Sequence, residues 1–265
     1  MQLKQCCQVV VLFLANILTA RNKCVLFPMS FLTAEWRKLA IANYAIDKNI
    51  LLPYLPAGTE LDLWNDICYV SLIGFLFKNT RLMGFRVPFH SNFEEVNLRF
   101  YVKRKDKDAW KRGVVFIKEI VPRYALSFVA NTFYNENYQS MPMRHSWIED
   151  EKNLTVEYQW RFKNQWQSIK VQADAAPSDI SIGSEAEFIT EHYWGYAKCT
   201  NLKSNEYEVR HPRWLQYKIG SFNIDVDFGL NYGADFGFLN HQQPDSVMLA
   251  EGSAISVESK KIILV

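Results

Sequence analysis

The sequence predicts a domain of the α+β class that is mainly antiparallel β, with a few short helices. Aromatic residues make up 15% of the chain, and their flat rings pack well across the face of a sheet. Residues 93–103 alternate strictly between polar and apolar side chains, as a strand packed on one face does. The segments 154–162 and 165–171 flank Lys163-Asn164, which indicates a tight hairpin turn.

One domain over residues 29–265 is expected. The chain has 265 residues, of which 49% are hydrophobic and 22% are charged, and this is the composition of a globular domain. Residues 1–28 form an apolar tail with three open interpretations: a signal peptide, an extra helix, or a segment upstream of a true start at Met29. The apolar run from Val9 to Ala20 is shorter than the roughly 20 residues that span a bilayer, so no stable membrane insertion is expected.

The net charge limits the classes of binding partner that are expected, and the cysteine usage indicates the cellular compartment. The 30 basic and 28 acidic residues leave a net charge of +2, which provides no drive toward nucleic acid. The basic residues between Lys103 and Arg112 are interrupted by acids and predict a solvated hairpin turn. Only Cys68 and Cys199 follow the tail, and no C-x-x-C motif occurs, so a cytoplasmic location is expected. Cys68 lies in an apolar strand and is predicted to be a core residue. The oligomeric state stays open.

The first half of the domain is expected to begin with a helix and to continue as strands. Thr33 is placed to cap a helix over 34–46, in which Trp36, Leu39 and Ala40 share one side. Turn signals and alternation predict the rest: a hairpin over 61–77 that turns at Asn65-Asp66, a loop over 78–90, and strands over 93–103 and 113–120.

The second half is expected to consist of strands joined by turns, with two short helices. A buried helix is predicted over 124–134. Ser184 and Glu187 match a capping box that opens a helix ending near Glu191. The chain from Tyr193 onward is interpreted as strand and turn, with strands at 246–250 and 255–257 around Gly252.

No pattern for catalysis, metal binding or cofactor binding stands out. No G-x-S-x-G elbow, P-loop or G-x-G-x-x-G motif occurs. The histidines are far apart in the sequence and none belongs to an H-x-H or H-E-x-x-H pattern, so neither a metal nor a cofactor is expected. They are His90, His145, His192, His211 and His241.

One strand carries an unusual set of polar side chains. Glu95, Asn97, Arg99 and Tyr101 face one way, and the apolar residues between them face the other. The apolar face must be packed against the domain. The polar face is then either solvated, where an ion pair is worth about 0–1 kcal/mol, or it lines a polar interior. Alternation alone favours the solvated face.

A set of motifs occurs in order along the chain: EWRKL at 35–39, ANY at 42–44, LLP at 51–53, LPAG at 55–58, VSL at 70–72, NTR at 79–81, FEEVNLR at 93–99, FLN at 238–240 and PDSV at 244–247. Together they resemble the YqjF-like family, a bacterial family of unknown function. The resemblance covers Met29 to the end of the chain, and it favours Met29 as the start.

That family is similar in fold to acetoacetate decarboxylase, so the resemblance implies a cone-shaped, mainly antiparallel β-barrel with an enclosed cavity. In acetoacetate decarboxylase a lysine forms a Schiff base with a β-keto acid, and a second lysine lowers its pKa. Carried over, the lysine pair falls on about Tyr138 and Gln139, which cannot form an imine. Of two assisting carboxylates, one corresponds to Glu95 and the other falls near Ser71. Acetoacetate decarboxylation is therefore not expected.

The resemblance also implies that the polar face of this strand points into the barrel. Glu95 and Arg99 are then expected to be buried in one hydrogen-bonded network, so that Arg99→Met would cost about 3–5 kcal/mol. The expected function is binding of a small carbonyl or anionic molecule. The alternative is an enzyme of the lyase or hydrolase type that works without an imine and uses Glu95 as acid or base. The expected ligand-binding residues are Glu95, Asn97, Arg99, Tyr101, Arg81 and Tyr138.

Overall fold

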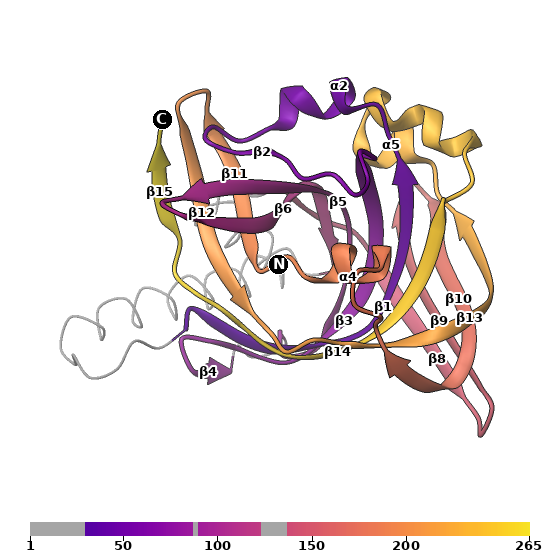
Figure 1. Cartoon of the computed structure of the whole chain (residues 1–265). Coiled ribbons are helices and arrows are strands. Elements are labelled where there is room, and N and C mark those ends of the chain that lie inside the picture. The colour runs from indigo at the N-terminus through magenta and orange to yellow at the C-terminus, as the bar shows by residue number, and fades with distance from the viewer. Residues whose placement is uncertain (1–29, 87–89, 123–136) are drawn as a thin grey trace, which may run out of the picture.

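The computed structural model describes residues 30–86, 90–122 and 137–265, and these residues are mostly strands (Figure 1). The tail at 1–28 and the helix predicted over 124–134 lie outside the described residues. In chain order the elements are β1 (Leu32–Ala45), α2 (Lys48–Leu51), the 3-10 helix η1 (Leu52–Tyr54), β2 (Glu60–Leu61), β3 (Tyr69–Leu82), β4 (Phe85–Arg86), β5 (Phe93–Asp106), β6 (Ala109–Val121), β7 (Tyr138–Ser140), β8 (Met143–Glu149), β9 (Asn153–Phe162), β10 (Gln165–Asp179), α4 (Glu185–Thr190), β11 (Trp194–Thr200), β12 (Lys203–Arg210), β13 (Leu215–Asp225), α5 (Phe228–Tyr232), the 3-10 helix η2 (Ala234–His241), β14 (Ser246–Val257) and β15 (Lys261–Leu264).

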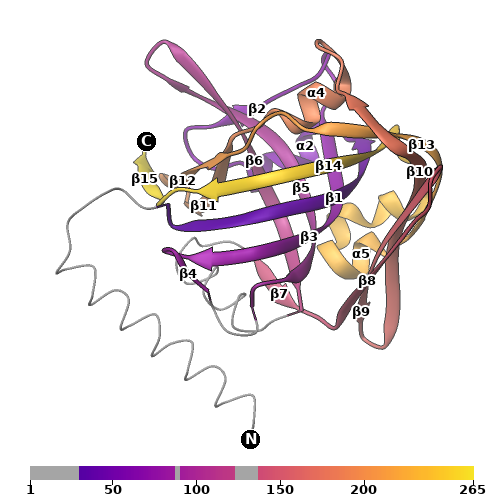
Figure 2. The same cartoon turned by 90° about the horizontal axis from the view of Figure 1, so that it is seen from below.

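The central strands of the sheet close into a ring. Neighbouring strands follow the order β12-β11-β6-β5-β3-β1-β14, and β14 pairs back with β12 through Val209↔Val257 and Arg210↔Ser256. Beyond β14 the sheet continues through β13, β10 and β9 to β8, along one flank of the ring (Figures 1 and 2). Most pairs are antiparallel, and β6 pairs in parallel with β11 and β7. The predicted class, mainly antiparallel β with short helices, is confirmed.

The wall of the ring separates two apolar cores. The inner core contains Ile41, Phe75 and Phe188, and the last of these comes from α4. The outer core contains Leu98 of β5 and Trp160 of β9, together with residues of α5 and η2. In Figure 1, α4 lies in the middle of the ring and α5 lies toward its flank. Because β5 contributes to both cores, its two faces meet different surroundings.

The first element is a strand, so the predicted helix over 34–46 is wrong. Leu39 and Ile41 face the inner core while Ala40 faces the outer core, which is the alternation of a strand. A bulge at Lys38, where φ is 52°, lengthens the step between the inward residues Trp36 and Leu39 to three. That spacing imitates the periodicity of a helix. Sheet pairing with β3 and β14 on both sides overrides the helical propensity of the segment.

Gly252 of β14 is opposite this bulge, and it permits the close approach of the two strands. Its φ is 79°, and a Cβ atom at this position would lie 2.1 Å from the carbonyl oxygen of Trp36. Any side chain at position 252 would therefore clash with the backbone of β1. The strands predicted on either side of Gly252 form one continuous strand, β14.

Three further predictions are corrected. The segment 61–77 is no hairpin, because β2 pairs with β5 and Asn65-Asp66 only closes a tight turn between Trp64 and Ile67. The predicted loop 78–90 includes the end of β3, which pairs with β4. After Tyr193 the chain contains α5 and η2. Asp227 caps α5 by accepting a hydrogen bond from the backbone N–H of Leu230 at 2.9 Å, a signal too short to be recognised in the sequence.

Other predicted elements are confirmed. β9 and β10 turn at Lys163-Asn164, where both residues have positive φ. Ser184 caps α4 by accepting from the Glu187 N–H. Cys68 is a buried core residue. The basic segment forms the β5–β6 hairpin, although two of its side chains, Arg104 and Lys111, bind the buried Glu206. Among the described residues, no helix is long and apolar enough to span a membrane.

Candidate functional site

The polar side chains of β5 face the inside of the ring. Glu95, Asn97, Arg99 and Tyr101 have exposed fractions of 2%, 2%, 8% and 1%. The flanking strands β3 and β6 hold β5 in place on both sides, while the apolar face of β5 packs into the outer core. The polar face therefore lines the interior of the barrel.

Glu95 is a carboxyl group held away from solvent. Burial raises its pKa to about 7, although hydrogen bonds from Asn97 and Tyr138 and the charge of Arg99 act in the opposite direction. The amide Nδ2 of Asn97 donates to Oε1 at 3.0 Å, and the hydroxyl of Tyr138 donates to Oε2 at 3.3 Å. Near neutral pH the group is thus able both to release and to accept a proton.

Tyr138 connects Glu95 to a second buried carboxyl group, Glu119. The tyrosine hydroxyl hydrogen bonds to Glu119, which lies beside Tyr138 in the β6–β7 register and opposite Asn97 in the β5–β6 register. Burial, first of all, and the two carboxyl groups raise the pKa of Tyr138 well above its usual range. The phenol therefore keeps its proton, and the three side chains form a row that can share protons.

Arg99 is a buried cation without an anionic partner among the described residues. Its Nη2 donates to the carbonyl oxygen of Ile189 in α4 at 3.3 Å, and its Cζ lies 5.6 Å from the centre of the Tyr101 ring. The Nε atom is buried and has no hydrogen-bond partner in the described part of the chain. A buried guanidinium in this state leaves donors to be satisfied.

The prediction that Glu95 and Arg99 share one hydrogen-bonded network is wrong for the described residues. Both residues are buried, but Glu95 is directed to Tyr138 of β7, whereas Arg99 is directed to Ile189 of α4. The two groups influence each other through their charges, and no hydrogen bond joins them. Two positions on the same face of a strand are close enough for an ion pair, but the neighbouring elements decide where each side chain points.

Tyr101 is held in place by hydrogen bonds that run from strand to strand along the barrel wall. Its hydroxyl lies 2.7 Å from Oγ of Ser71, which donates to Oδ1 of Asn43 at 2.6 Å. Asn43 in turn donates to Oγ of Ser246 at 2.9 Å, and Ser246 donates to Glu185 of α4. This chain joins four neighbouring strands to α4, so it holds the ring of Tyr101 in a defined position beside Arg99.

A buried pair of residues, Asp62 and His192, lies next to this tyrosine. Nε2 of His192 is 3.2 Å from Oδ2 of Asp62, and that oxygen also accepts from Nε of Arg112 at 2.6 Å. The ring of His192 is 4.7 Å from the ring of Tyr101, centre to centre. Burial lowers the pKa of His192 to about 4, with the charges of Arg112 and Arg99 acting in the same direction. The imidazole is therefore neutral at pH 7, and its buried Nδ1 has no partner among the described residues.

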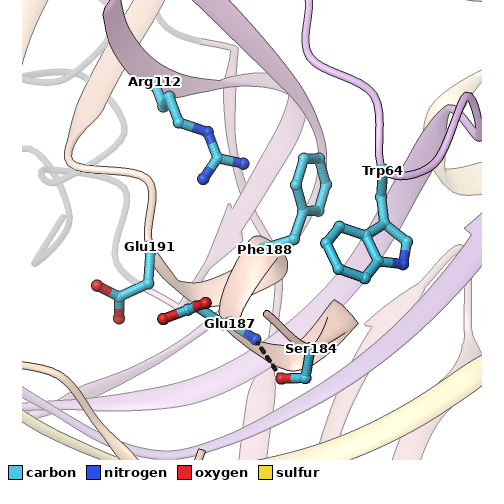
Figure 3. A pocket seen from close by; sticks show the side chains of 6 residues that line it. All are labelled: Trp64, Arg112, Ser184, Glu187, Phe188 and Glu191. Atoms are coloured by element: carbon cyan, nitrogen blue, oxygen red, sulfur yellow. Dashed lines mark hydrogen bonds between the residues drawn. The ribbon is translucent and has the colours of Figure 1, made fainter. Parts of the chain in front are cut away.

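A pocket of about 320 Å³ lies beside Phe188 of α4 (Figure 3). Its lining consists of Trp64, Arg112, Ser184, Glu187, Phe188 and Glu191. Phe188 is placed between Arg112 and Trp64 in Figure 3, and its ring centre is also 5.4 Å from that of Tyr101. Phe188 therefore lines this pocket and also neighbours Tyr101.

The remaining predicted ligand-binding residue, Arg81, does not join the others. It is exposed near the end of β3, where its guanidinium donates to the carbonyl oxygen of Gly84 at 3.4 Å. The structure brings together Glu95, Asn97, Arg99, Tyr101 and Tyr138.

Sequence reasoning missed Asp62, His192 and Glu119. Asp62 and His192 are 130 positions apart, and no local pattern links them. Glu119 was hidden by a bulge in β6: simple alternation groups it with Ile117, but the register shift beside Arg99 turns Glu119 inward and leaves Ile117 in the outer core. No signal in a single sequence predicts such a bulge.

Comparison with known proteins places this chain in a family. Residues 33–254 match the DUF2071 family, described as an uncharacterized conserved protein (COG2071). The uncharacterized protein YqjF of Bacillus subtilis (strain 168) is 27% identical over 185 residues, which cover 68% of this chain and 72% of YqjF.

Solved structures with a similar fold include enzymes. The enduracididine biosynthesis enzyme MppR with bound HEPES buffer has a TM-score of 0.64 at 11% identity, covering 91% of this chain and 90% of that chain. Acetoacetate decarboxylase from Legionella pneumophila has a TM-score of 0.60 at 11% identity, covering 89% and 88%. At this identity the likeness concerns the fold. The chain therefore belongs to the DUF2071 family and has the acetoacetate decarboxylase-like fold.

Proposed function

We propose that the interior of the barrel binds a small carboxylic acid, whose carboxylate pairs with Arg99. The observation that carries this proposal is the state of Arg99: its side chain is buried, no described residue forms an ion pair with it, and Nε has no acceptor. Burying an unpaired charge costs several kcal/mol, and a bound anion offsets that cost. Guanidinium groups suit carboxylates because two parallel N–H donors match two oxygens.

The rest of the polar face supports a ligand that also carries a carbonyl or hydroxyl group. Oδ1 of Asn97 is a buried acceptor without a partner, and the carboxyl group of Glu95 acts as donor or acceptor near pH 7. Structural relatives with the same fold are consistent with a small acid, since the enzyme MppR has been solved as a complex with pyruvate.

Isothermal titration of the full chain with L-lactate, D-lactate, pyruvate, acetoacetate and propionate tests this function. We expect at least one acid to bind, and Arg99→Met to weaken that binding at least about tenfold, which corresponds to 1.4 kcal/mol. Arg81→Met is the matched control, because Arg81 is exposed and apart from the interior, and it should bind as the wild type does. Absence of binding, or equal losses in the two variants, contradicts the proposal.

A second candidate function, an enzyme that uses Glu95 as acid or base, is favoured by the pKa of about 7 and by the hydrogen bond from Tyr138. Such a group is suited to moving a proton next to a carbonyl. This proton transfer is measured directly by NMR, as the rate at which the methyl protons of pyruvate are replaced by deuterium in D₂O. Catalysed exchange that disappears in Glu95→Gln while binding persists indicates an enzyme, and exchange equal to the buffer rate indicates a binding protein.

Either function is expected to proceed without an imine. Tyr138 and Gln139 occupy the positions to which the lysine pair of acetoacetate decarboxylase is carried over, and no lysine hydrogen bonds to Glu95 or Arg99 in the described part of the chain. Borohydride with acetoacetate should therefore leave the mass of the protein unchanged. An adduct on a lysine, mapped by mass spectrometry, contradicts this expectation.

A further inference from the structure

The Asp62–His192 pair provides a feature that can select among the acids that bind in the barrel interior. Because the pKa of Asp62 is lowered by hydrogen bonds from His192 and Arg112 in spite of its burial, Asp62 is a carboxylate at neutral pH. A carboxylate only accepts hydrogen bonds, so the nitrogen that faces it, Nε2 of His192, carries the imidazole proton. The other nitrogen, Nδ1, then has no proton and presents a lone pair that can accept a hydrogen bond.

This lone pair is buried and has no hydrogen-bond partner among the described residues. The side chain of His192 has an exposed fraction of 1%, so water does not reach it freely. An unsatisfied buried acceptor of this kind costs about 1–3 kcal/mol, unless a donor is supplied from outside the protein.

Arg99 and His192 have Tyr101 as a common neighbour. Both side chains pack against Tyr101, with the guanidinium carbon 5.6 Å and the imidazole centre 4.7 Å from the centre of its ring. Arg99 also donates to the carbonyl oxygen of Ile189, three positions before His192, and its charge acts on the imidazole. An unpartnered donor and an unpartnered acceptor thus lie beside the same aromatic ring.

We propose that the interior selects acids that carry a hydroxyl group next to the carboxylate, with the carboxylate on Arg99 and the hydroxyl donating to Nδ1 of His192. The ligand class is a small 2-hydroxy acid or the enol form of a 2-oxo acid. A 2-oxo acid in its keto form presents only acceptors, so its carbonyl oxygen faces the lone pair of Nδ1 and the acceptor stays unsatisfied. This inference rests on the proposed function and names the ligand class of the same site.

Titration of the full chain with L-lactate, D-lactate, pyruvate and propionate tests the selection. One lactate enantiomer is expected to bind at least about tenfold more tightly than pyruvate and propionate, which corresponds to 1.4 kcal/mol. His192→Phe keeps a ring against Tyr101 but removes the acceptor, and it should abolish the preference while the affinity for propionate changes little. His145→Phe is the control, because His145 lies at the outside of the barrel beside Glu94.

The outcomes separate this inference from the proposed function. Equal binding of lactate and pyruvate, or a preference that survives in His192→Phe, overturns the hydroxyl selection and leaves the binding function intact. Binding of none of the acids overturns both.

If His192→Phe does not fold, a second measurement on the wild-type protein tests the same inference. In ¹⁵N-labelled wild-type protein, the imidazole resonances should show a proton on Nε2 and none on Nδ1 at pH 7, and lactate should shift the Nδ1 resonance. A proton on Nδ1 in the free protein overturns the proposed acceptor.

Discussion

At the scale of single residues, two arginines of β5, the buried Arg99 and the half-buried Arg104, show how a partner decides the effect of a charge. Arg99 has no anionic partner among the described residues, whereas Nε of Arg104 lies 2.7 Å from Oε2 of Glu206, a carboxylate with an exposed fraction of 2%. Removing an unpaired buried charge relieves a desolvation cost, while removing one half of a buried pair leaves the other half behind. The two residues therefore form a natural comparison.

We predict that Arg99→Met changes the free energy of unfolding by less than about 1 kcal/mol or increases it, and that Arg104→Met lowers it by more than about 2 kcal/mol. Urea denaturation at pH 7 measures both variants. This replaces the larger loss expected for Arg99→Met from an ion pair with Glu95. A loss of about 3 kcal/mol in Arg99→Met would mean that Arg99 has an anionic partner in the folded protein.

Glu95 and His192 make the stability depend on pH in opposite directions. The pKa of Glu95 rises from 4.5 to about 7 on folding, so the folded state holds the extra proton and stability falls as the pH rises through this window. The pKa of His192 falls from 6.5 to about 4, so the unfolded state holds the extra proton and stability falls as the pH decreases through that window. Between about pH 4.5 and 6.5 the two contributions oppose each other.

We predict that Glu95→Gln removes the first contribution. Relative to wild type, the variant should gain stability between pH 4.5 and 7, by on the order of 3 kcal/mol in total. Denaturation curves at half-unit pH steps across this range give the difference. Glu151→Gln, at an exposed position, is the control and should follow the wild-type curve. A Glu95→Gln curve parallel to wild type would show that Glu95 titrates normally in the fold.

At the scale of elements, the close approach of β1 and β14 beside Arg37 depends on backbone space that only glycine leaves. Gly252 and Gly183 both have a φ near 80°, but a Cβ on Gly252 would be 2.1 Å from the carbonyl oxygen of Trp36, whereas a Cβ on Gly183 meets nothing within 4 Å. The two positions thus share the conformational cost of a left-handed residue and differ in the clash.

We predict that Gly252→Ala destabilises the fold by more than about 3 kcal/mol and Gly183→Ala by only about 1–2 kcal/mol. Thermal or urea unfolding of the two variants measures the difference. Similar losses would indicate that β1 and β14 separate locally at low cost.

At the scale of the whole molecule, the two apolar cores share one sheet. β5 directs apolar residues to the outer core and polar residues to the inside of the ring, and the pairing of β12 with β14 closes the ring. Opening one core exposes the strands that support the other. The described domain is therefore expected to unfold as one unit.

We predict that Trp160 in the outer core and Trp214 in the inner core report the same urea midpoint. Both are buried, with exposed fractions of 0% and 3%, so their fluorescence should change on unfolding. The signal of each is obtained by subtracting the curve of its Trp→Phe variant, and Trp110→Phe, at an exposed position, is the control. Two distinct midpoints would mean that the cores open separately.

Local patterns in the sequence determined the mainly antiparallel fold class, the polar face of β5, the β9–β10 hairpin and the cap of α4, because each depends on residues a few positions apart. Only the tertiary structure decided the rest. Pairing on both sides made 32–45 a strand, and the β6 bulge turned Glu119 inward. Packing between distant segments brought His192 to Asp62 and directed Arg99 to α4 and away from Glu95. These contacts join residues that are close only after the ring has closed, so no local pattern encodes them.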